Sequence, residues 1–167
     1  NAGRGAVIDN AALLALLESG SSLRVALDVW EGEPSINLSL MEKVALATPH
    51  IAGYSVEGKV RGTEMLAEAF KQLADADAET LTEQPKTVAT LTAETVSELI
   101  LASYDVAEDD LRMRSALNAS SDVAQAFDLL RKQYPERHEF SRYKFSVETQ
   151  QAQPELIAQA LKLGFRE

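Results

Sequence analysis

The chain has 167 residues, of which 46% are hydrophobic and 25% are charged, and its formal net charge at pH 7 is −10. This composition excludes global disorder and supports the packed core of one ordinary domain or two small ones. The acidic balance argues against a nucleic-acid partner, and the longest apolar run, residues 11–17, is too short to cross a membrane. The absence of cysteine excludes disulfides and thiol catalysis and fits a reducing compartment, the cytoplasm.

Residues 1–20 predict the end of a strand, a glycine turn and a helix. The string NAGRGAVIDN indicates the strand end, the turn and then a short extended run, after which Asp9 or Asn10 caps the helix. The helix is rich in Ala and Leu and stops at Gly20, a residue type that favours the end of a helix. Because the chain opens on this turn without a methionine, we expect it to be a piece of a longer protein.

Residues 23–55 continue the alternation of strand and helix. The mostly apolar run at 23–31 is typical of a strand buried on both faces of a parallel sheet. Residues 40–44 predict a short helix, and residues 44–53 predict a short strand that leads into a loop. This order of elements predicts an α/β fold in which helices cross over between parallel strands.

The rest of the chain predicts a long helix, a linker and a second unit. Apolar residues recur at nearly helical spacing from about residue 57 to residue 76, whereas residues 77–90 lose this periodicity and contain Pro85. We therefore predict a first domain at 1–76, a linker at 77–90 and a small α+β domain at 91–167.

The second unit predicts several helices and a strand. Its first helix begins with a capping box at Thr92 or Thr95. Further helices are predicted at 107–117, 120–134 and 153–164, the alternating residues 142–149 indicate a strand, and Phe165 begins a last strand.

Three polar residues each follow a predicted strand, namely Arg4, Glu33 and His50. Ligands of open α/β sheets bind beyond the carboxyl ends of the strands, so these side chains are expected to share one edge of the sheet. Each residue on its own is also typical of a turn, a strand end or a structural loop. Their joint placement is what indicates a functional site.

Other kinds of site lack support in the sequence. Gly3 and Gly5 flank Arg4, but a dinucleotide fingerprint needs a third glycine and an immediate helix. His50 and His138 stand apart from other metal-binding residues, so no metal site is predicted. The sequence also has no GxSxG nucleophile elbow.

Three consecutive blocks, NAGRGAVIDNAALLALLESG, ALDVWEGEP and TPHIAGYS, resemble those of the NAD-dependent D-2-hydroxyacid dehydrogenases in residues, order and spacing. The resemblance covers residues 1 to about 75 and implies the C-terminal half of a Rossmann-type NAD-binding domain. It also implies that the phosphate-binding glycine loop and the substrate domain precede this chain, so that this chain alone is inactive.

The resemblance implies three catalytic residues. Arg4 is similar to the arginine that binds the substrate carboxylate through its forked donors. His50 is similar to the acid–base residue that accepts the proton of the 2-hydroxyl, and Glu33 to the carboxylate that orients this histidine.

The resemblance also implies residues that bind NAD and the substrate. Asp28 is similar to the acidic residue at the nicotinamide end of the cofactor, and its alternative role is a cap at the sheet edge. The remaining candidates are Ala2, Gly3 and Arg4, which present backbone to the cofactor, Gly53, which leaves room for it, and Tyr54, which reaches the substrate.

The tail favours a branch of the family that acts on a phosphorylated 2-hydroxy acid and carries an additional C-terminal dimerisation domain, which implies a homodimer. The strings EGKVRGT, LLRKQYPERHEF and LKLGF carry this resemblance. Within a cluster of basic residues at 131–144, Arg137 is the candidate for binding the substrate phosphate across the dimer interface. The alternative is that this cluster forms a solvated helix end and strand face.

Three other functions stay open on the sequence alone. The first is another member of the same family, acting on glycerate, phosphoglycerate or a lactate-like acid. The second is a non-catalytic, NAD-sensing interaction protein of the same fold, and the third is a dimerising scaffold. The sequence also leaves open the choice between NAD and NADP.

Overall fold

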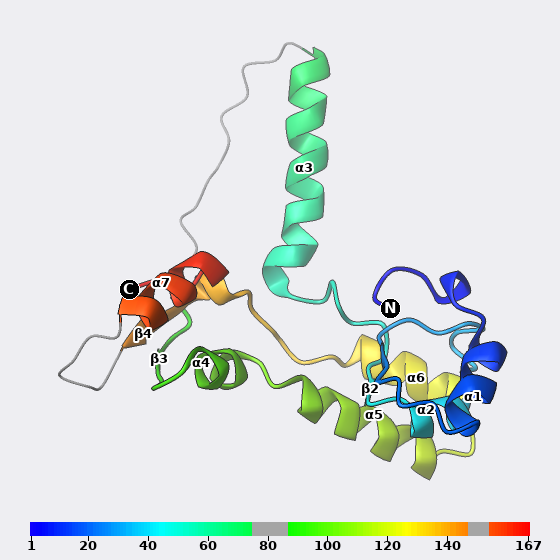
Figure 1. The fold of residues 1–167 in the computed structure, drawn as a ribbon. Helices are drawn as coiled ribbons and strands as arrows, with labels where there is room; N and C mark the ends of the chain where they lie inside the picture. Colours follow the sequence, from blue (N-terminus) through cyan, green and yellow to red (C-terminus); the bar gives the residue numbers. More distant parts are fainter. Residues whose placement is uncertain (75–86, 147–153) are drawn as a thin grey trace. The chain divides into compact units, whose positions relative to one another are not determined.

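The computed structural model describes residues 1–74, 87–146 and 154–167 (Figure 1). The chain divides into two compact units, each built from two separate stretches of chain. Unit 1 contains residues 1–53 and 106–135, and unit 2 contains residues 54–105 and 136–167. The predicted domain boundaries follow the chain, and their linker at 77–90 falls mostly outside the described residues, so those boundaries stay a prediction.

A parallel sheet lies in unit 1. Strands β1 (Ala26–Leu27) and β2 (Leu46–Ala47) pair in parallel, with Ala26 opposite Leu46. On the other side of β1, the amino group of Asn1 donates to the carbonyl of Ala26 at 2.8 Å, and Asp28 N–H donates to the carbonyl of Asn1 at 2.9 Å. Three segments therefore run side by side in the order Asn1, β1, β2, as expected for parallel strands.

The strands are shorter than the apolar runs at 23–31 and 44–53 predict. An apolar run predicts that its residues are buried, and Leu27 to Trp30 are buried. The length of a strand depends instead on how far its backbone pairs with a neighbouring strand. Beyond β1, the backbone N–H of Trp30 donates to the side chain of Glu33 and not to a neighbouring strand.

The first long helix begins and ends at residues that the sequence indicates. α1 (Asn10–Glu18) begins where Asp9 accepts the N–H of Ala12 at 2.9 Å, so Asp9 and not Asn10 is the cap. It ends before Gly20, whose φ of +90° is a left-handed conformation that glycine adopts at low cost.

The extended run predicted after the glycine turn is instead a single turn of 3-10 helix, η1 (Gly5–Val7). Gly5 lies against the backbone of Trp30, and a Cβ added to Gly5 would sit 2.0 Å from the carbonyl oxygen of Trp30. The close approach requires glycine at this position, and it involves a residue far along the chain that the local sequence does not indicate.

Two helices from the second half of the sequence, α5 (Val106–Ala119) and α6 (Val123–Lys132), belong to unit 1 (Figure 1). Asp110 of α5 accepts the N–H of Ala47 at 2.6 Å, so α5 covers the outer edge of β2. The buried core draws apolar side chains from the sheet, from α2 (Leu38–Lys43) and from both helices: Leu27, Trp30, Leu40, Met41, Ala47, Met113, Leu117 and Phe127.

Arg114 links α5 to the end of α2 through hydrogen bonds. Its guanidinium donates to the carbonyl of Met41 at 2.6 Å and to that of Val44 at 3.0 Å, and it pairs with Asp110 on its own helix. The last carbonyls of α2 are therefore satisfied by a side chain from α5.

Unit 2 combines a second small parallel sheet with helices. β3 (Ala89–Thr92) pairs with β4 (Tyr143–Ser146) in parallel. The core between the sheet and the helices contains Ala93, Leu99, Phe145, Ala160 and Phe165. The other elements are α3 (Val56–Ala74), α4 (Val96–Ser103), the 3-10 turn η2 (Phe140–Arg142) and α7 (Pro154–Leu163).

The ends of the elements in unit 2 resolve the alternatives that the sequence left open. Thr95 and not Thr92 caps α4, because Thr95 accepts the N–H of Glu98 while the Glu98 carboxylate accepts the N–H of Thr95, both at 3.2 Å. The last strand predicted from Phe165 is reduced to an isolated bridge between Lys144 and Arg166.

β3 is a strand that the sequence does not predict. The sequence pattern assigns its residues partly to the linker and partly to the following helix. Four residues are too few for a clear alternation, and the strand depends on β4, which lies far along the chain.

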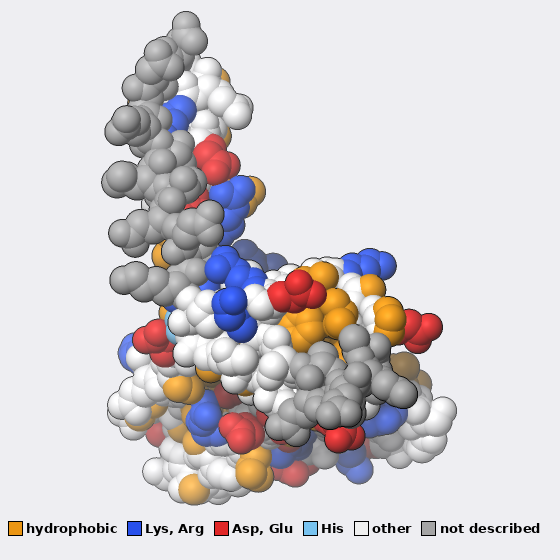
Figure 2. Space-filling model, turned by 90° about the vertical axis from the view of Figure 1, so that its left-hand side faces the viewer, with side chains coloured by type: hydrophobic (Ala, Val, Ile, Leu, Met, Phe, Trp, Pro, Cys, Tyr) orange, Lys and Arg blue, Asp and Glu red, His pale blue; other side chains and the backbone are white. Residues whose placement is uncertain are grey.

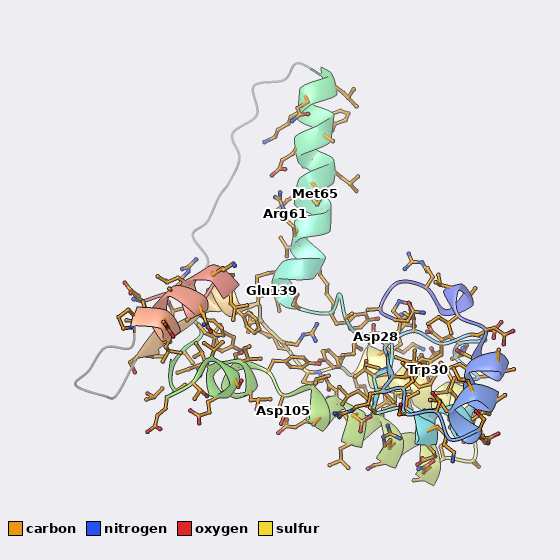
Figure 3. All side chains as sticks on the ribbon, in the orientation of Figure 1. Asp28, Trp30, Arg61, Met65, Asp105 and Glu139 are labelled. Carbon is orange, nitrogen blue, oxygen red and sulfur yellow. The ribbon has the colours of Figure 1, made fainter. Side chains whose placement is uncertain are left out.

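α3 carries an exposed apolar stripe in the described structure. Leu66, Phe70 and Leu73 are 74%, 68% and 87% exposed. Arg61, which is labelled on this helix in Figure 3, pairs with Glu68 at 2.9 Å. Within the described ranges, none of the helices combines the length and the apolar character that crossing a membrane requires.

One face of the described structure carries charges of both signs. Figure 2 shows Lys and Arg side chains interspersed with Asp and Glu on the face that it presents. Although the chain has a net charge of −10, the face shown in Figure 2 is therefore not uniformly acidic.

Candidate active site

His50 and Glu33 form the centre of the candidate site. His50 Nδ1 lies 2.7 Å from Glu33 Oε2, and the two side chains are 33% and 19% exposed. His50 follows Pro49 and has a φ of +58°, the left-handed region that few residues other than glycine adopt. The structure thus brings together two residues that the sequence predicted to meet at one edge of the sheet.

A backbone hydrogen bond from Trp30, three residues earlier in the chain, holds the side chain of Glu33. Its second oxygen, Oε1, accepts the backbone N–H of Trp30 at 2.7 Å. The indole of Trp30 is buried, and its Nε1–H donates to the carbonyl of Thr48 at 3.0 Å. Trp30 therefore connects the Glu33 segment to the segment that carries His50.

Asp28, labelled with Trp30 in Figure 3, is buried at the end of β1. Its Oδ1 accepts the hydroxyl of Thr48 at 2.7 Å and the N–H of Ile51 at 2.8 Å, and its Oδ2 accepts the N–H of Ala52 at 3.0 Å. Asp28 was predicted to contact the cofactor or to cap the sheet edge, and these contacts make it a cap for the His50 loop.

Arg4 lies at the end of the segment that pairs with the outer side of β1. Its Nη1 donates to the carbonyl of Gly3 at 2.9 Å, and the side chain is exposed. Its other guanidinium N–H groups have no partner among the residues that the structure describes. Arg4 is thus available to a ligand, although it does not join the contact between Glu33 and His50.

The groups that could hold the nicotinamide end of NAD lie around the same strand ends. Ala2 and Gly3 are exposed, and a cavity of about 170 Å³ is lined partly by Ala2, Asp28 and Thr48. A Cβ added to Gly53 would meet no described atom within 4 Å. These groups are compatible with one end of a dinucleotide, and the cavity is too small for all of it.

Two predicted substrate residues lie in unit 2. The Nζ of Lys59 lies over the ring of Tyr54, 4.4 Å from the ring centroid. The guanidinium carbon of Arg137 lies 4.6 Å from the ring centroid of Tyr104, and the carbonyl of Arg137 accepts the N–H of Val56 at 2.9 Å. Their roles toward a substrate stay predictions.

The basic cluster predicted near Arg137 is largely paired with carboxyl groups and carbonyls. Arg142 donates to Glu57 Oε1 at 2.9 Å, and Lys144 donates to the carbonyl of Glu167 at 2.6 Å. His138 contacts the same Glu57 oxygen through Nδ1 at 3.0 Å. The role of this cluster toward a substrate phosphate stays a prediction, as does the alternative of a solvated helix end and strand face.

Glu57 accepts hydrogen bonds from His138, Arg142 and the backbone N–H of Glu139. Burial acts to raise its pKa, but hydrogen bonds from His138 and from the backbone N–H of Glu139 outweigh burial and hold the pKa below its ordinary value. Burial, and then the negative charge of Glu57, raise the pKa of Tyr143.

Sequence reasoning missed the residues that support the site, above all Thr48 and Trp30. The sequence predicts Thr48 only as part of a short strand that leads into a loop, and Trp30 only as part of a buried strand. Their hydrogen bonds cross from one strand end to the next, so a sequence pattern carries no direct signal for them.

Two family models match the chain. Residues 1–52 match the model described as D-isomer specific 2-hydroxyacid dehydrogenase, NAD binding domain. Residues 78–164, more than half of the chain, match a model described as a domain of unknown function, DUF3410.

Curated relatives named erythronate-4-phosphate dehydrogenase are similar to the chain over most of its length. The relative from Saccharophagus degradans is 39% identical over 173 residues, which cover 99% of this chain and 44% of the relative. The relatives from Proteus mirabilis and Cellvibrio japonicus are 46% and 42% identical, over 84% and 90% of this chain. The chain covers 39% and 43% of those two proteins, so it spans about two fifths of the length of its relatives.

These similarities agree with the resemblance seen in the three sequence blocks. The match over residues 1–52 confirms the predicted NAD-binding domain of the dehydrogenase family in the N-terminal part of the chain. The chain therefore belongs to the DUF3410 domain family, and its DUF3410 domain follows a D-isomer specific 2-hydroxyacid dehydrogenase NAD binding domain.

Proposed function

We propose that the whole protein is an NAD-dependent dehydrogenase that oxidises 4-phospho-D-erythronate to 3-hydroxy-2-oxo-4-phosphooxybutanoate. The observation that carries this proposal is the 2.7 Å contact between His50 and Glu33 at the carboxyl ends of parallel strands. The name of the relatives, erythronate-4-phosphate dehydrogenase, supports this choice of substrate.

His50 is the base that takes the proton of the substrate's 2-hydroxyl. A carboxylate only accepts hydrogen bonds, so Glu33 holds the proton of neutral His50 on Nδ1 and leaves the lone pair of Nε2 for the hydroxyl. When Nε2 takes that proton, the imidazole becomes positive, and the Glu33 carboxylate stabilises the charge. A positioned base of this kind accelerates a reaction about 10²- to 10⁴-fold.

Arg4 binds the substrate carboxylate. Its exposed guanidinium offers N–H groups that have no partner in the described part of the chain, in the fork that suits two carboxylate oxygens. In this proposal, the substrate that Arg4 binds has its C2 directed toward His50.

NAD supplies the acceptor for the hydride that leaves C2. Toward this cofactor, the chain provides the exposed backbone of Ala2 to Arg4 and the open space at Gly53. Asp28 Oδ2 accepts a single bond, from Ala52, in the described structure and keeps a lone pair for a donor on the nicotinamide.

Arg137 is our candidate for the substrate phosphate, contributed by the partner subunit of a homodimer, and Tyr54 for a contact with the substrate. We expect Arg137→Ala to raise the KM for 4-phospho-D-erythronate and to leave NAD affinity unchanged. Unchanged kinetics would remove Arg137 from the site. Sedimentation of the whole protein tests the dimer, and a monomer would remove a phosphate ligand donated by a partner.

The product is a 2-oxo acid with a 4-phosphate, and we assign the reaction to the biosynthesis of pyridoxine and pyridoxal 5′-phosphate in the cytoplasm. Growth of a strain that lacks the protein, with and without added pyridoxine, tests this assignment. A strain that grows equally well under both conditions would contradict it.

The experiment that tests the reaction mixes the whole protein with 4-phospho-D-erythronate and NAD and follows the absorbance of NADH. His50→Ala is assayed beside it and is expected to abolish the absorbance change while NAD still binds. If glycerate, phosphoglycerate or lactate is oxidised and 4-phospho-D-erythronate is not, the protein is a member of the same dehydrogenase family that acts on a different substrate. NAD binding without turnover of any hydroxy acid would favour a non-catalytic, NAD-sensing role.

A further inference from the structure

The loop that carries His50 is attached at both ends to one carboxylate. Thr48, before the histidine, donates its hydroxyl to Asp28, and Ile51 and Ala52, after it, donate their backbone N–H groups to the same side chain. The three bonds measure 2.7, 2.8 and 3.0 Å, and Asp28 is only 8% exposed. Bonds to a buried carboxylate are stronger than those between neutral groups.

This attachment holds a backbone conformation that is costly for histidine. His50 has a φ of +58°, a region that non-glycine residues seldom occupy unless the surrounding structure holds them there. Asp28 supplies that support, because its bonds fix the residue two places before His50 and the two residues that follow it.

The conformation of His50 decides whether its ring reaches Glu33. Glu33 is fixed independently, since its Oε1 accepts the N–H of Trp30 at 2.7 Å. If the loop relaxed to an ordinary backbone conformation, Nδ1 would leave Glu33 Oε2, which now lies 2.7 Å away.

We propose that Asp28 is a positioning residue for the base His50: its carboxylate holds the loop so that the imidazole meets Glu33. This inference rests on the proposed dehydrogenase function and adds to the cofactor contact proposed for Asp28. Thr48 supports the same arrangement, because its hydroxyl donates a hydrogen bond to Oδ1 of Asp28.

The first test uses structure alone and so does not depend on any activity. In the whole protein, Asp28→Asn places an N–H₂ group where one of the three donors now points, and we expect faster amide exchange in residues 50–53 than in the wild type. Asp9→Asn is the matched control, because Asp9 also accepts a backbone N–H, at the start of α1. Equal exchange in Asp28→Asn and the wild type would overturn the proposal.

The second test measures turnover with 4-phospho-D-erythronate and NAD. A misplaced base costs about 10- to 100-fold in rate, so we expect Asp28→Asn to lower kcat by that factor at saturating NAD, in addition to any loss of NAD affinity from the proposed nicotinamide contact. Asp28→Asn and Glu33→Gln should impair the same base. The kcat of the double variant should therefore fall by a smaller factor than the product of the two factors measured for the single variants. A weakened NAD affinity with unchanged kcat, or fully multiplicative losses, would overturn the positioning role.

Thr48→Val keeps the proposal testable if Asp28→Asn does not fold. Valine preserves the shape of the buried side chain and removes the hydroxyl that donates to Asp28. We expect a smaller change in the same direction, both in exchange at residues 50–53 and in kcat. An unchanged Thr48→Val would overturn the proposal, whereas a wild type without turnover would instead refute the proposed reaction.

Discussion

At the scale of single residues, the end of β1 supports the candidate site with side chains that hold different atoms. Glu33 faces the imidazole of His50, Asp28 holds the backbone around it, and Trp30 binds both Glu33 and Thr48. A short stretch of chain therefore determines the position of one histidine.

The contact between Glu33 and His50 predicts the effect of Glu33→Gln. The amide is neutral and can offer its N–H₂ group to Nδ1, so it stabilises the positive imidazole less and favours the wrong tautomer. We expect kcat of the whole protein to fall at least about tenfold. Glu31→Gln, in the same loop but bonded to the N–H of Asn10, should keep wild-type kcat. Equal losses in both variants would argue against a specific role for Glu33.

The contact between Gly5 and Trp30 predicts a loss of stability in Gly5→Ala. The new Cβ would lie 2.0 Å from the carbonyl oxygen of Trp30, so the backbone must shift. We expect the free energy of unfolding in urea to fall by about 1–3 kcal/mol. Gly53→Ala is the comparison, because its Cβ meets no described atom within 4 Å, and it should keep stability while weakening NAD binding. A stable Gly5→Ala would show that this turn adapts easily.

At the scale of elements, the start of α3 is fixed by residues that follow much later in the chain. Ser55 Oγ accepts the N–H of Gly58 at 3.0 Å and donates to the carboxylate of Glu139, which is labelled near the base of α3 in Figure 3. Glu57, in the first turn, contacts His138 and Arg142. The helix thus begins where a cap and an ion-pair cluster coincide.

The lowered pKa of Glu57 predicts a pH dependence of stability. Because the folded-state pKa lies below the ordinary value of 4.5, the ionised form stabilises the fold at pH values above 4.5. This contribution is lost as the pH falls below 4.5 and through the folded-state pKa. Urea unfolding of the wild type and Glu57→Gln should therefore differ most near neutral pH and converge in acid. Glu18→Gln, an exposed change at the end of α1, should show no such convergence.

At the scale of the whole molecule, the two compact units do not follow the order of the sequence. α5 and α6 come after the predicted linker, yet they complete the core around β1 and β2. A fragment cut at residue 86 would therefore separate these helices from the strands that they cover. Experiments on assembly are better made with the whole protein.

The shared core predicts that α6 stabilises the sheet of the candidate site. Phe127 is fully buried, and Phe127→Ala should cost about 3–5 kcal/mol of unfolding free energy. The amides of Leu46 and Thr48, which donate to Val25 and Leu27, should then exchange faster. Leu129→Ala, on the same helix but 44% exposed, is the matched control. Slow exchange at both amides in Phe127→Ala would show that the sheet holds without α6.

The sequence by itself determined the local features of this protein. The sequence marks the end of α1 at Gly20, and it narrows two helix caps to Asp9 or Asn10 and to Thr92 or Thr95, because side-chain caps and glycine freedom act over a few residues. The placement of Glu33 and His50 at neighbouring strand ends followed from the parallel order of the strands. Such features depend on residues that lie close along the chain or on a regular topology.

Only the tertiary structure decided the rest. β3 forms because it pairs with β4, which lies far along the chain. The backbone of Trp30 leaves no room for a side chain at Gly5, and Asp110 and Arg114 attach α5 to unit 1. The three bonds that Asp28 makes to the His50 loop are of the same kind. Each is a contact between residues far apart along the chain. Its free energy arises only after folding has brought them together, so no local pattern in the sequence records it.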